Sequence, residues 1–553
     1  MEIKHYEFEY GEYGDTIGVN INLRGFDVLQ YNQINKSTAF SLEERLKLTL
    51  NGYLPPRVRT LEDQVKNCLK TVDEKETPIE KFIYLRSLYD RNVVLAHAVI
   101  ASDVTRFLPI IYTPTVGQAC QQYSAMFRRA NGIHFFPGNI DDAEAILRNY
   151  TDRDIRVAVV TDNQGILGIG DQGAGGIPIC LGKLMLYTQG AGIAPWHCLP
   201  ISLDVGTDNE ALLNDPNYLG WRERRLTGAA YDEFVEKFVT AFKKVFPKAL
   251  CQWEDFSKQT AFSVRDKYVK EVISFNDDIQ GTGSIALAGI LAAMKAKNEK
   301  MTDQIYLVHG AGAGGVGIAE QIQTELMEQG MDEKDAIAKI FTLDSKGVVT
   351  SDRDIEPYKL KFAKAPESLA WLTKPEDNNL LNAIKNEKVT VLIGTSGQPG
   401  CFTKEVIDAV GKNTDRPVIL PLSNPTTKAE ALPVDVYEWT DGKALVATGS
   451  PFDNVDHKGK SFRIGQMNNA FVFPGVGLGI VASGATEVLP VFFSAAAHAV
   501  AEFITDEDIA DGILCPPLHQ LQEVSIEVAK RHENDEARLN TLIEKMVWKP
   551  KYL

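Results

Sequence analysis

The stretch QIYLVHGAGAGGVGIAEQI, residues 304–322, decides the fold class of this chain. Residues 305–308 form an apolar run typical of a buried strand, and a helix is expected from Ile318 onward. The glycines between them follow the pattern G-x-G-x-x-G, which allows a tight turn, lets backbone approach a ligand, and permits close packing of helix on strand. The stretch therefore predicts the strand–turn–helix unit of a dinucleotide-binding domain.

An acidic residue follows at the distance that such a unit requires. Asp344 ends the apolar run IFTLD, where a carboxylate can bind ribose hydroxyls. Its charge would repel a 2′-phosphate, which favours NAD, although Ser345 and Lys346 could contact such a phosphate and keep NADP as the less favoured cofactor. The residues predicted from this pattern to bind the cofactor are Gly310, Gly312, Gly315, Gly317 and Asp344.

Apolar runs on both sides of this unit indicate parallel sheets. Residues 389–396, 418–424 and 444–449 follow it, and residues 157–162 and 199–206 precede it. The first 130 residues read as mostly helical. We therefore expect an α/β protein with a helical N-terminal region and Rossmann-like parallel-sheet domains, in which a nucleotide domain is inserted in a discontinuous catalytic domain. The predicted parts are residues 1–130 (helical), 131–276 with 467–537 (catalytic), 277–466 (NAD-binding) and 538–553 (C-terminal tail).

A second glycine cluster also fits G-x-G-x-x-G. Gly168, Gly170 and Gly173 follow the apolar run 157–162. No helix is expected directly after them, because Pro178 interrupts the pattern. We interpret this cluster as a turn that lets backbone approach a ligand or another strand.

Composition narrows the class of protein. The 553 residues carry 58 Lys and Arg against 74 Asp and Glu, a net charge of −16, which disfavours nucleic-acid binding. No run approaches the roughly 20 uncharged residues of a membrane span, and the N-terminus lacks the apolar run of a signal peptide. Seven scattered cysteines without metal-binding spacing indicate a reducing, cytoplasmic compartment.

Two acidic pairs stand in apolar and aromatic surroundings. Glu254 and Asp255 lie in CQWEDF, and Asp277 and Asp278 lie in FNDDIQGTG. Buried like charges must be neutralised, and three carboxylates from two segments suit Mg²⁺ or Mn²⁺. The alternative is two solvated acidic turns. Lys183, in the apolar stretch GKLMLY, is expected to have a depressed pKa and to act as a base, unless it reaches water.

Several longer strings resemble one enzyme family. They are YTPTVG (residues 112–117), GILGIGDQG (165–173), GKL (182–184), WEDF (253–256), FNDDIQGTG (275–283), LSNPT (422–426) and NNAFVFPGVGLG (468–479). In this order they resemble the large-subunit malic enzymes, which include the related malolactic enzymes. The resemblance runs from about Lys36 to about Val500.

The resemblance implies a role for individual residues. Tyr112 matches the general acid, Lys183 the general base, and Asp277 the carboxylate that orients this lysine. Glu254, Asp255 and Asp278 match metal ligands for Mn²⁺ or Mg²⁺. Asn424, Asn468 and Asn469 match asparagines at the substrate, and Asn424 also matches a cofactor contact.

One departure from the family pattern leaves the reaction open. Many malic enzymes have an arginine, which pairs with a substrate carboxylate, where this chain has Gly165. Its absence is similar to malolactic enzymes, whereas YTPTVG is the malic-enzyme form. We therefore expect NAD-linked oxidative decarboxylation of L-malate to pyruvate, with malolactic conversion to L-lactate as the alternative and an inactive nucleotide-binding sensor as a remote one. The resemblance also implies a homodimer or homotetramer, while the charge and hydropathy predict no nucleic-acid or membrane partner.

Overall fold

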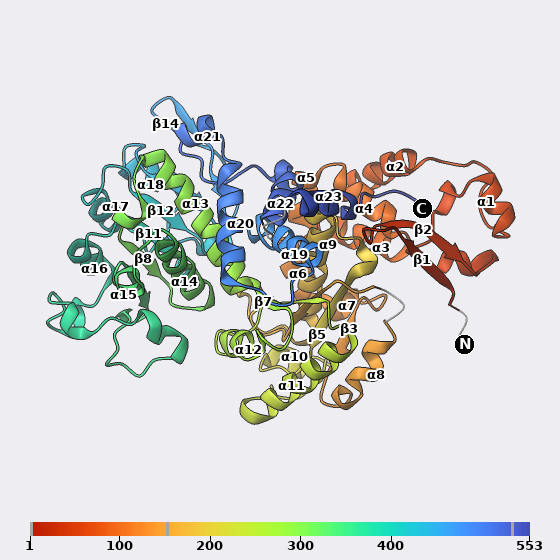
Figure 1. Ribbon diagram of the computed structural model, residues 1–553, viewed down its shortest axis with the longest axis horizontal. Helices are drawn as coiled ribbons and strands as arrows, with labels where there is room; N and C mark the ends of the chain where they lie inside the picture. The colour runs from red at the N-terminus through yellow and green to blue at the C-terminus, as the bar shows by residue number, and fades with distance from the viewer. Residues whose placement is uncertain (1–3, 151–153, 532–535) are drawn as a thin grey trace.

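The computed structural model describes residues 4–150, 154–531 and 536–553 (Figure 1). Its largest sheet has seven strands in the order β10-β9-β8-β11-β12-β13-β16. All neighbours are parallel except β10, which pairs antiparallel with β9. The strands are β8 (Tyr306–His309), β9 (Ile340–Asp344), β10 (Gly347–Val348), β11 (Val391–Gly394), β12 (Val418–Pro421), β13 (Leu445–Thr448) and β16 (Gly465–Gln466).

Alternate residues of this sheet face two separate apolar layers. Val308, Ile393 and Leu420 pack in the main core, together with α13 (Thr282–Lys297), α14 (Ala313–Glu328) and α20 (Pro490–Glu502). The opposite face packs on α16 (Leu380–Glu387), α17 (Lys404–Gly411) and α18 (Pro433–Trp439). A parallel sheet covered on both faces explains why its strands read as continuous apolar runs.

A second parallel sheet carries the acidic pairs at its edge. Its order is β3-β5-β4-β6-β7, and neighbouring strands are parallel. The strands are β3 (Ile133–Phe135), β4 (Val157–Thr161), β5 (Cys198–Leu203), β6 (Leu250–Trp253) and β7 (Ser274–Asn276). They are connected by helices including α9 (Ile177–Ala191), α10 (Glu210–Asn214), α11 (Gly228–Val245) and α12 (Thr260–Tyr268).

Two helices begin earlier than the sequence predicts. Pro178 does not interrupt the helix: it stands in the first turn of α9, where its missing N–H costs nothing, so a helix does follow the glycine cluster Gly168–Gly173. The helix after the dinucleotide turn begins at Ala313 rather than at Ile318. Gly315 and Gly317 therefore lie inside its first turns, where a side chain would meet neighbouring backbone.

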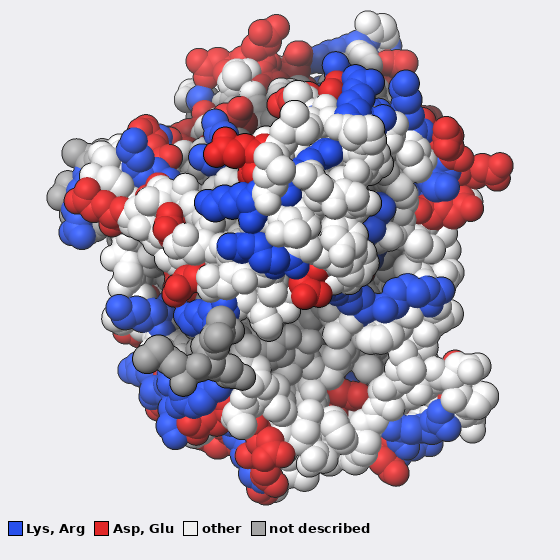
Figure 2. Space-filling view, turned by 90° about the vertical axis from the view of Figure 1, so that its right-hand side faces the viewer, with Lys and Arg blue, Asp and Glu red and all other residues white. Residues whose placement is uncertain are grey.

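The N-terminal region is helical, as predicted, but it opens with a hairpin that the sequence did not indicate. Strands β1 (Tyr6–Tyr10) and β2 (Thr16–Ile21) pair antiparallel. The helices that follow are α1 (Leu42–Lys47), α2 (Leu61–Asp73), α3 (Pro78–Arg91), α4 (Val93–Ala101), α5 (Val104–Ile111), α6 (Thr115–Gln121) and α7 (Tyr123–Met126). Figure 2 shows that cationic and acidic side chains are interspersed on the face that this region forms.

The C-terminal end, for which the sequence predicts only a tail over residues 538–553, packs against the N-terminal region. In α23 (Glu536–Met546), Leu539 and Ile543 are buried. Trp548 packs edge-on against Trp196, and the Tyr552 hydroxyl donates to Gln64 at 2.6 Å. Apolar residues spaced four apart among the charges account for this burial.

The helices after the nucleotide-type sheet return to the second sheet. In α19 (Phe473–Ser483) and α22 (Leu521–Lys530), one face packs on α9 (Figure 1). This return agrees with a discontinuous arrangement and confirms the α/β fold class, while the exact domain boundaries stay a prediction. One helical segment, Asp277–Lys297, is long and apolar enough to span a membrane by length and composition, and 72% of its apolar window is buried inside the protein.

Candidate active site

Three carboxylates gather at the carboxyl ends of β6 and β7. Glu254 and Asp255 follow β6, and Asp278 lies in the π-helical turn Asp277–Gly281 that follows β7. Because the two strands are parallel neighbours, their ends meet at one edge of the sheet. Ligand oxygens of the three side chains lie within 4.8 Å of one another. The sequence-based alternative of two solvated turns is therefore wrong: Glu254 and Asp255 are only 2% and 6% exposed.

The electrostatics of this cluster call for a cation. Burial, followed by the neighbouring carboxylates, raises the pKa of Glu254 and of Asp255 well above its usual range, although Lys183 opposes the shift. Burial raises the pKa of Asp278 to about 6. Packed oxygen donors of this kind fit a divalent cation such as Mg²⁺ or Mn²⁺, which would neutralise the repulsion.

Lys183 reaches the cluster from the middle of α9. Its Nζ lies 2.9 Å from Oε1 of Glu254 and donates a hydrogen bond to Asp277. The expected depressed pKa is wrong. Burial alone would lower the pKa of the Lys183 ammonium, but the charges of Asp277 and Glu254 outweigh burial and raise the pKa well above its ordinary value.

Tyr112 stands beside this lysine. It directly follows α5, and its ring centre lies 5.5 Å from Nζ of Lys183, while the ring centre of Phe473 lies 4.5 Å from the same nitrogen. Burial raises the pKa of the Tyr112 phenol well above 10, so the hydroxyl is protonated. The structure thus brings the predicted acid, the predicted base and Asp277 together.

The three asparagines take different places. Asn469 donates to Oδ2 of Asp277 at 3.1 Å, so it joins the lysine site. Asn424 follows β12, is exposed, and accepts a hydrogen bond from Ser450. Asn468 instead caps a short helical turn, where its Oδ1 accepts from the amide of Ala470 at 2.9 Å. Contacts of Asn424 and Asn468 with a substrate stay predictions.

The glycine turn after β8 forms one wall of a cavity of about 750 Å³. A Cβ added at Gly310 would lie 2.5 Å from the backbone of Thr395. A Cβ at Gly315 would lie 1.8 Å from the carbonyl oxygen of Gly310, and a Cβ at Gly317 would lie 2.2 Å from the carbonyl oxygen of Ile279. Gly312 faces open space and caps α14, whose N-terminus can hold a pyrophosphate. The cavity and its backbone cradle therefore fit a dinucleotide.

Asp344 lines the same cavity but is not free of partners. Its carboxylate accepts from Arg353 and lies 3.6 Å from Nζ of Lys359, and these contacts lower the pKa of Asp344 although burial opposes the shift. Neither cation is indicated by the sequence pattern. They lie 9 and 15 residues beyond Asp344 across an irregular segment, so no spacing rule would have found them.

Two further residues that shape the site were also missed. An added Cβ at Gly281 would lie 1.8 Å from Oδ1 of Asp277, so only glycine leaves room for this carboxylate. Gln252 accepts from the Tyr187 hydroxyl at 2.6 Å and donates to Oε2 of Glu254 at 2.9 Å. Gln252 and Glu254 are two residues apart at the end of β6, a spacing that puts both side chains on the same face of the sheet. This spacing is the signal in the sequence that could have indicated Gln252.

Two family models match most of this chain. The family model of the malic enzyme N-terminal domain matches residues 89–269, and that of the malic enzyme NAD-binding domain matches residues 279–534. The chain is 42% identical over 538 residues to an NAD-dependent malic enzyme of Sodalis glossinidius, covering 95% of each chain. It is 41% identical over 541 residues to one of Acinetobacter baylyi, covering 96% of each.

Solved structures agree at the level of the fold. The malic enzyme of Entamoeba histolytica superposes with a TM-score of 0.54 at 20% identity, over 91% of this chain and 90% of that one. An NAD-dependent malic enzyme of Thermotoga maritima superposes with a TM-score of 0.51 at 22% identity, over 78% of this chain and 93% of that one. The matching sequence models, the long relatives and the buried acid–lysine site lead to one conclusion: this chain belongs to the malic enzyme family.

Proposed function

We propose that this chain catalyses the metal-dependent oxidative decarboxylation of L-malate to pyruvate and CO₂, with reduction of NAD. The observation that carries the proposal is Lys183, which is buried between Asp277 and Glu254 and lies beside Tyr112. A buried lysine and a protonated tyrosine, next to a carboxylate cluster and a dinucleotide cavity, suit the oxidation of a hydroxy acid followed by protonation of a carbon.

The residues that would hold the metal and the cofactor can be named, together with the chemistry that each group supplies. Glu254, Asp255 and Asp278 would hold Mn²⁺ or Mg²⁺, which when bound supplies stabilisation of negative charge on a substrate oxygen. The glycine turn and Asp344 would hold NAD, which when bound supplies the acceptor for the hydride from C2 of malate. The relatives carry the name NAD-dependent malic enzyme, which supports NAD over NADP for this chain.

The chain's own residues manage the protons. Nζ of Lys183 takes the proton of the C2 hydroxyl when the nitrogen is neutral, and Asp277 keeps the side chain in place. After the bond between C3 and the departing carboxylate breaks, the protonated Tyr112 delivers a proton to C3, and Lys183 restores the proton on the tyrosine. Asn469 holds Asp277 at Oδ2, so the lysine and its carboxylate form one oriented unit.

One observation keeps malolactic conversion as the second candidate. A Cβ at Gly165 would lie 2.4 Å from the carbonyl oxygen of Phe256, so this backbone leaves no room for the arginine that many malic enzymes have there. Pyruvate then lacks one cationic partner, and its release relative to a second hydride transfer decides the product. An inactive sensor is the weakest reading, because Tyr112, Lys183 and all four acids are present.

A product assay tests the proposal. Purified protein is supplied with L-malate, NAD and Mn²⁺, while NADH absorbance, pyruvate and lactate are measured together. One NADH and one pyruvate per malate consumed is the expected result. Lactate without a rise in NADH would establish the malolactic outcome instead. If no malate is consumed, the inactive nucleotide-binding sensor is the remaining hypothesis. The same assay with NADP in place of NAD checks the cofactor preference.

Assembly and location belong to the same proposal. The family resemblance supports a cytoplasmic homodimer or homotetramer, with the domain division at residues 130, 276, 466 and 537 predicted above. Light scattering coupled to gel filtration measures the mass in solution. A monomer of 61.2 kDa would contradict the expected assembly.

A further inference from the structure

The loop between β4 and α9 contains residues in an unfavourable backbone conformation. Asn163 and Leu167 adopt φ angles of +66° and +44°, in the left-handed region that side chains disfavour. Such backbone persists only where surrounding contacts hold it. The contacts that hold this loop therefore determine where its amide groups point.

The loop supports one of the predicted metal ligands. The amide of Leu167 donates to Oδ2 of Asp255 at 3.1 Å, and the amide of Gly165 donates to the Asp255 carbonyl oxygen at 2.8 Å. Asp255 itself has a φ of +55°. With one carboxylate oxygen and the backbone of Asp255 both held by the loop, the direction of the remaining oxygen depends on the loop conformation.

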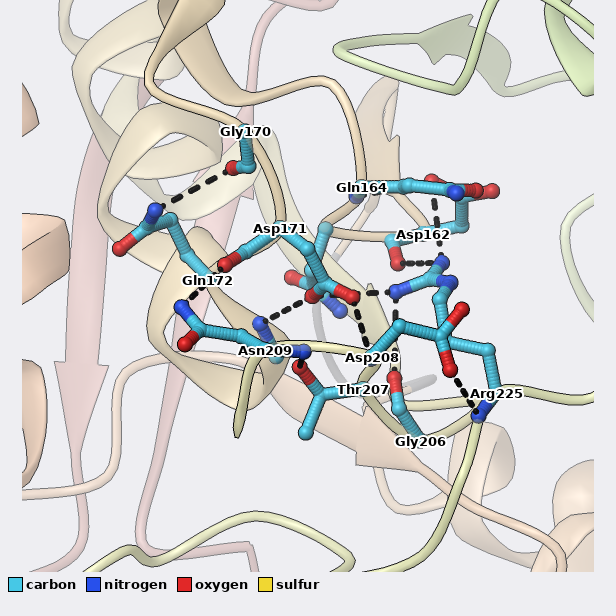
Figure 3. A network of polar contacts seen from close by, with 12 residues as sticks. Asp162, Gln164, Gly170, Asp171, Gln172, Gly206, Thr207, Asp208, Asn209 and Arg225 are labelled. Atoms are coloured by element: carbon cyan, nitrogen blue, oxygen red, sulfur yellow. Dashed lines mark hydrogen bonds and ion pairs between the residues drawn. The ribbon is translucent and has the colours of Figure 1, made fainter. Parts of the chain in front are cut away.

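Arg225 fastens this loop to the sheet (Figure 3). Its guanidinium donates to the carbonyl oxygen of Asp162 at 2.7 Å and to that of Gly206 at 3.1 Å. It also donates to Oδ1 of Asp171, within the loop, at 3.3 Å. Because the Arg225 side chain is 2% exposed, no water competes for these donors. One buried side chain thus joins the ends of β4 and β5 to the glycine loop.

The acidic partners of Arg225 are themselves tied to the surrounding backbone. The Asp171 carboxylate accepts from the amides of Gly173 at 2.9 Å and Asp208 at 2.8 Å. Asp162, 3.5 Å from the guanidinium, accepts from the Tyr231 hydroxyl at 2.8 Å. A buried charge pair surrounded by these donors is costly to break from one side, because the remaining charge loses its partner.

We propose that Arg225 is a positioning residue for the metal site, which acts by holding the 163–173 loop in the conformation that orients Asp255. The inference rests on the proposed function, since it assumes that Asp255 is a ligand. The hydrogen bonds and ion pairs of Arg225 go to Asp162, Asp171, Gly206 and Asp208 and not to the three acids, so its influence passes through Asp171 and the loop backbone. Replacing it should therefore weaken metal binding while leaving intact the dinucleotide cavity, whose lining includes neither Arg225 nor Asp171.

The test compares Arg225→Lys with a matched control. Arg45 is also a buried arginine that donates to backbone carbonyls, those of Phe40 and Pro55 among them, but it lies in the N-terminal region. Mn²⁺ dissociation constants are measured by electron paramagnetic resonance without substrate, and NAD dissociation constants by fluorescence. Loss of a group that supports a metal ligand typically weakens metal binding about 10–100-fold. We expect that loss for Arg225→Lys, with unchanged NAD binding, and no change in either constant for Arg45→Lys.

Each other outcome is decisive. Unchanged Mn²⁺ binding in folded Arg225→Lys, or equal loss of Mn²⁺ and NAD binding, would overturn the proposal, because either result shows at most a general structural role. If Arg225→Lys does not fold, Asp171→Asn replaces it, with weakened Mn²⁺ binding expected and unchanged binding contradicting the proposal. Asp255→Asn tests the underlying function separately: wild-type Mn²⁺ affinity in that variant would remove Asp255 as a ligand whatever Arg225 does.

Discussion

Nζ of Lys183 lies 2.9 Å from Oε1 of Glu254, so a residue predicted as a base is ion-paired with a residue predicted as a metal ligand. Both side chains are 2% exposed. The lysine thus neutralises part of the carboxylate cluster from within the protein. We expect its removal to lower turnover without weakening metal binding, which would separate its two roles.

We expect Lys183→Ala to lower turnover by about 10²–10⁴-fold, the usual contribution of a proton-transfer group. Mn²⁺ binding should stay the same or tighten, because a positive charge beside Glu254 is lost. Steady-state rates and electron paramagnetic resonance titration measure the two quantities. Turnover near that of the wild type would remove Lys183 from the mechanism, whereas loss of Mn²⁺ binding would show that the lysine organises the cluster.

Gly165→Arg should not restore the carboxylate contact of other malic enzymes. The added Cβ would lie 2.4 Å from the Phe256 carbonyl oxygen and would displace the segment that carries Asp255. Overpacking of this kind costs about 1–3 kcal/mol. We expect a lower thermal midpoint and a higher KM for malate.

The control for Gly165→Arg is Gly411→Ala, at an exposed position in α17 with no atom within 4 Å of the added Cβ. In this control, we expect the free energy of unfolding to rise by about 0.4–1 kcal/mol, because alanine reduces the conformational freedom of the unfolded chain. A lower KM for malate in Gly165→Arg would contradict the steric argument.

Two glycines of the cofactor turn should respond differently to alanine. At Gly315 the Cβ would lie 1.8 Å from the Gly310 carbonyl oxygen, so the turn itself must move. At Gly312 nothing lies within 4 Å, so the apo protein tolerates the methyl group, which projects where the dinucleotide would approach. We expect Gly315→Ala to lower the thermal midpoint and weaken NAD binding.

Gly312→Ala should weaken NAD binding without any change in the thermal midpoint of the apo protein. An overpacking cost of about 1–3 kcal/mol corresponds to roughly five- to 150-fold in the dissociation constant. Calorimetry of NAD binding and thermal unfolding without cofactor distinguish the two variants. Unchanged NAD affinity in Gly312→Ala would show that the dinucleotide does not bind against this turn.

Acid should destabilise the protein through His97. Burial lowers the pKa of His97 to about 3, and its Nδ1 lies 2.8 Å from Nε2 of Gln189, which requires a neutral acceptor. A folded-state pKa below the unfolded value of 6.5 contributes stability above pH 6.5 and loses it as the pH falls toward 3. The loss is about 1.4 kcal/mol per pH unit.

His97→Asn tests this assignment, because its Oδ1 can accept from Gln189 but does not titrate. We expect the variant to be less stable than the wild type at pH 8, with a gap that narrows as the pH falls from 6.5 toward 5. Urea unfolding at a series of pH values measures the gap. A gap that stays constant with pH would show that His97 does not account for the acid sensitivity.

The sequence by itself determined the parts of this protein that depend on short-range patterns. The apolar run before Gly310, the glycine spacing and the position of Asp344 predict a dinucleotide turn, because strand, turn and helix propensities act over neighbouring residues. The same holds for the acidic pairs, whose apolar and aromatic neighbours indicated burial. These local signals predicted the α/β class and the location of the site.

Only the tertiary structure decided how the charged groups behave. Lys183 and Asp277 are 94 residues apart, and their contact reverses the predicted direction of the lysine pKa. Arg225 and Asp162 are 63 residues apart, so nothing in the local sequence indicates that this arginine holds the 163–173 loop in place. Electrostatic energies depend on distance and burial in space, and both are fixed only when remote segments pack together.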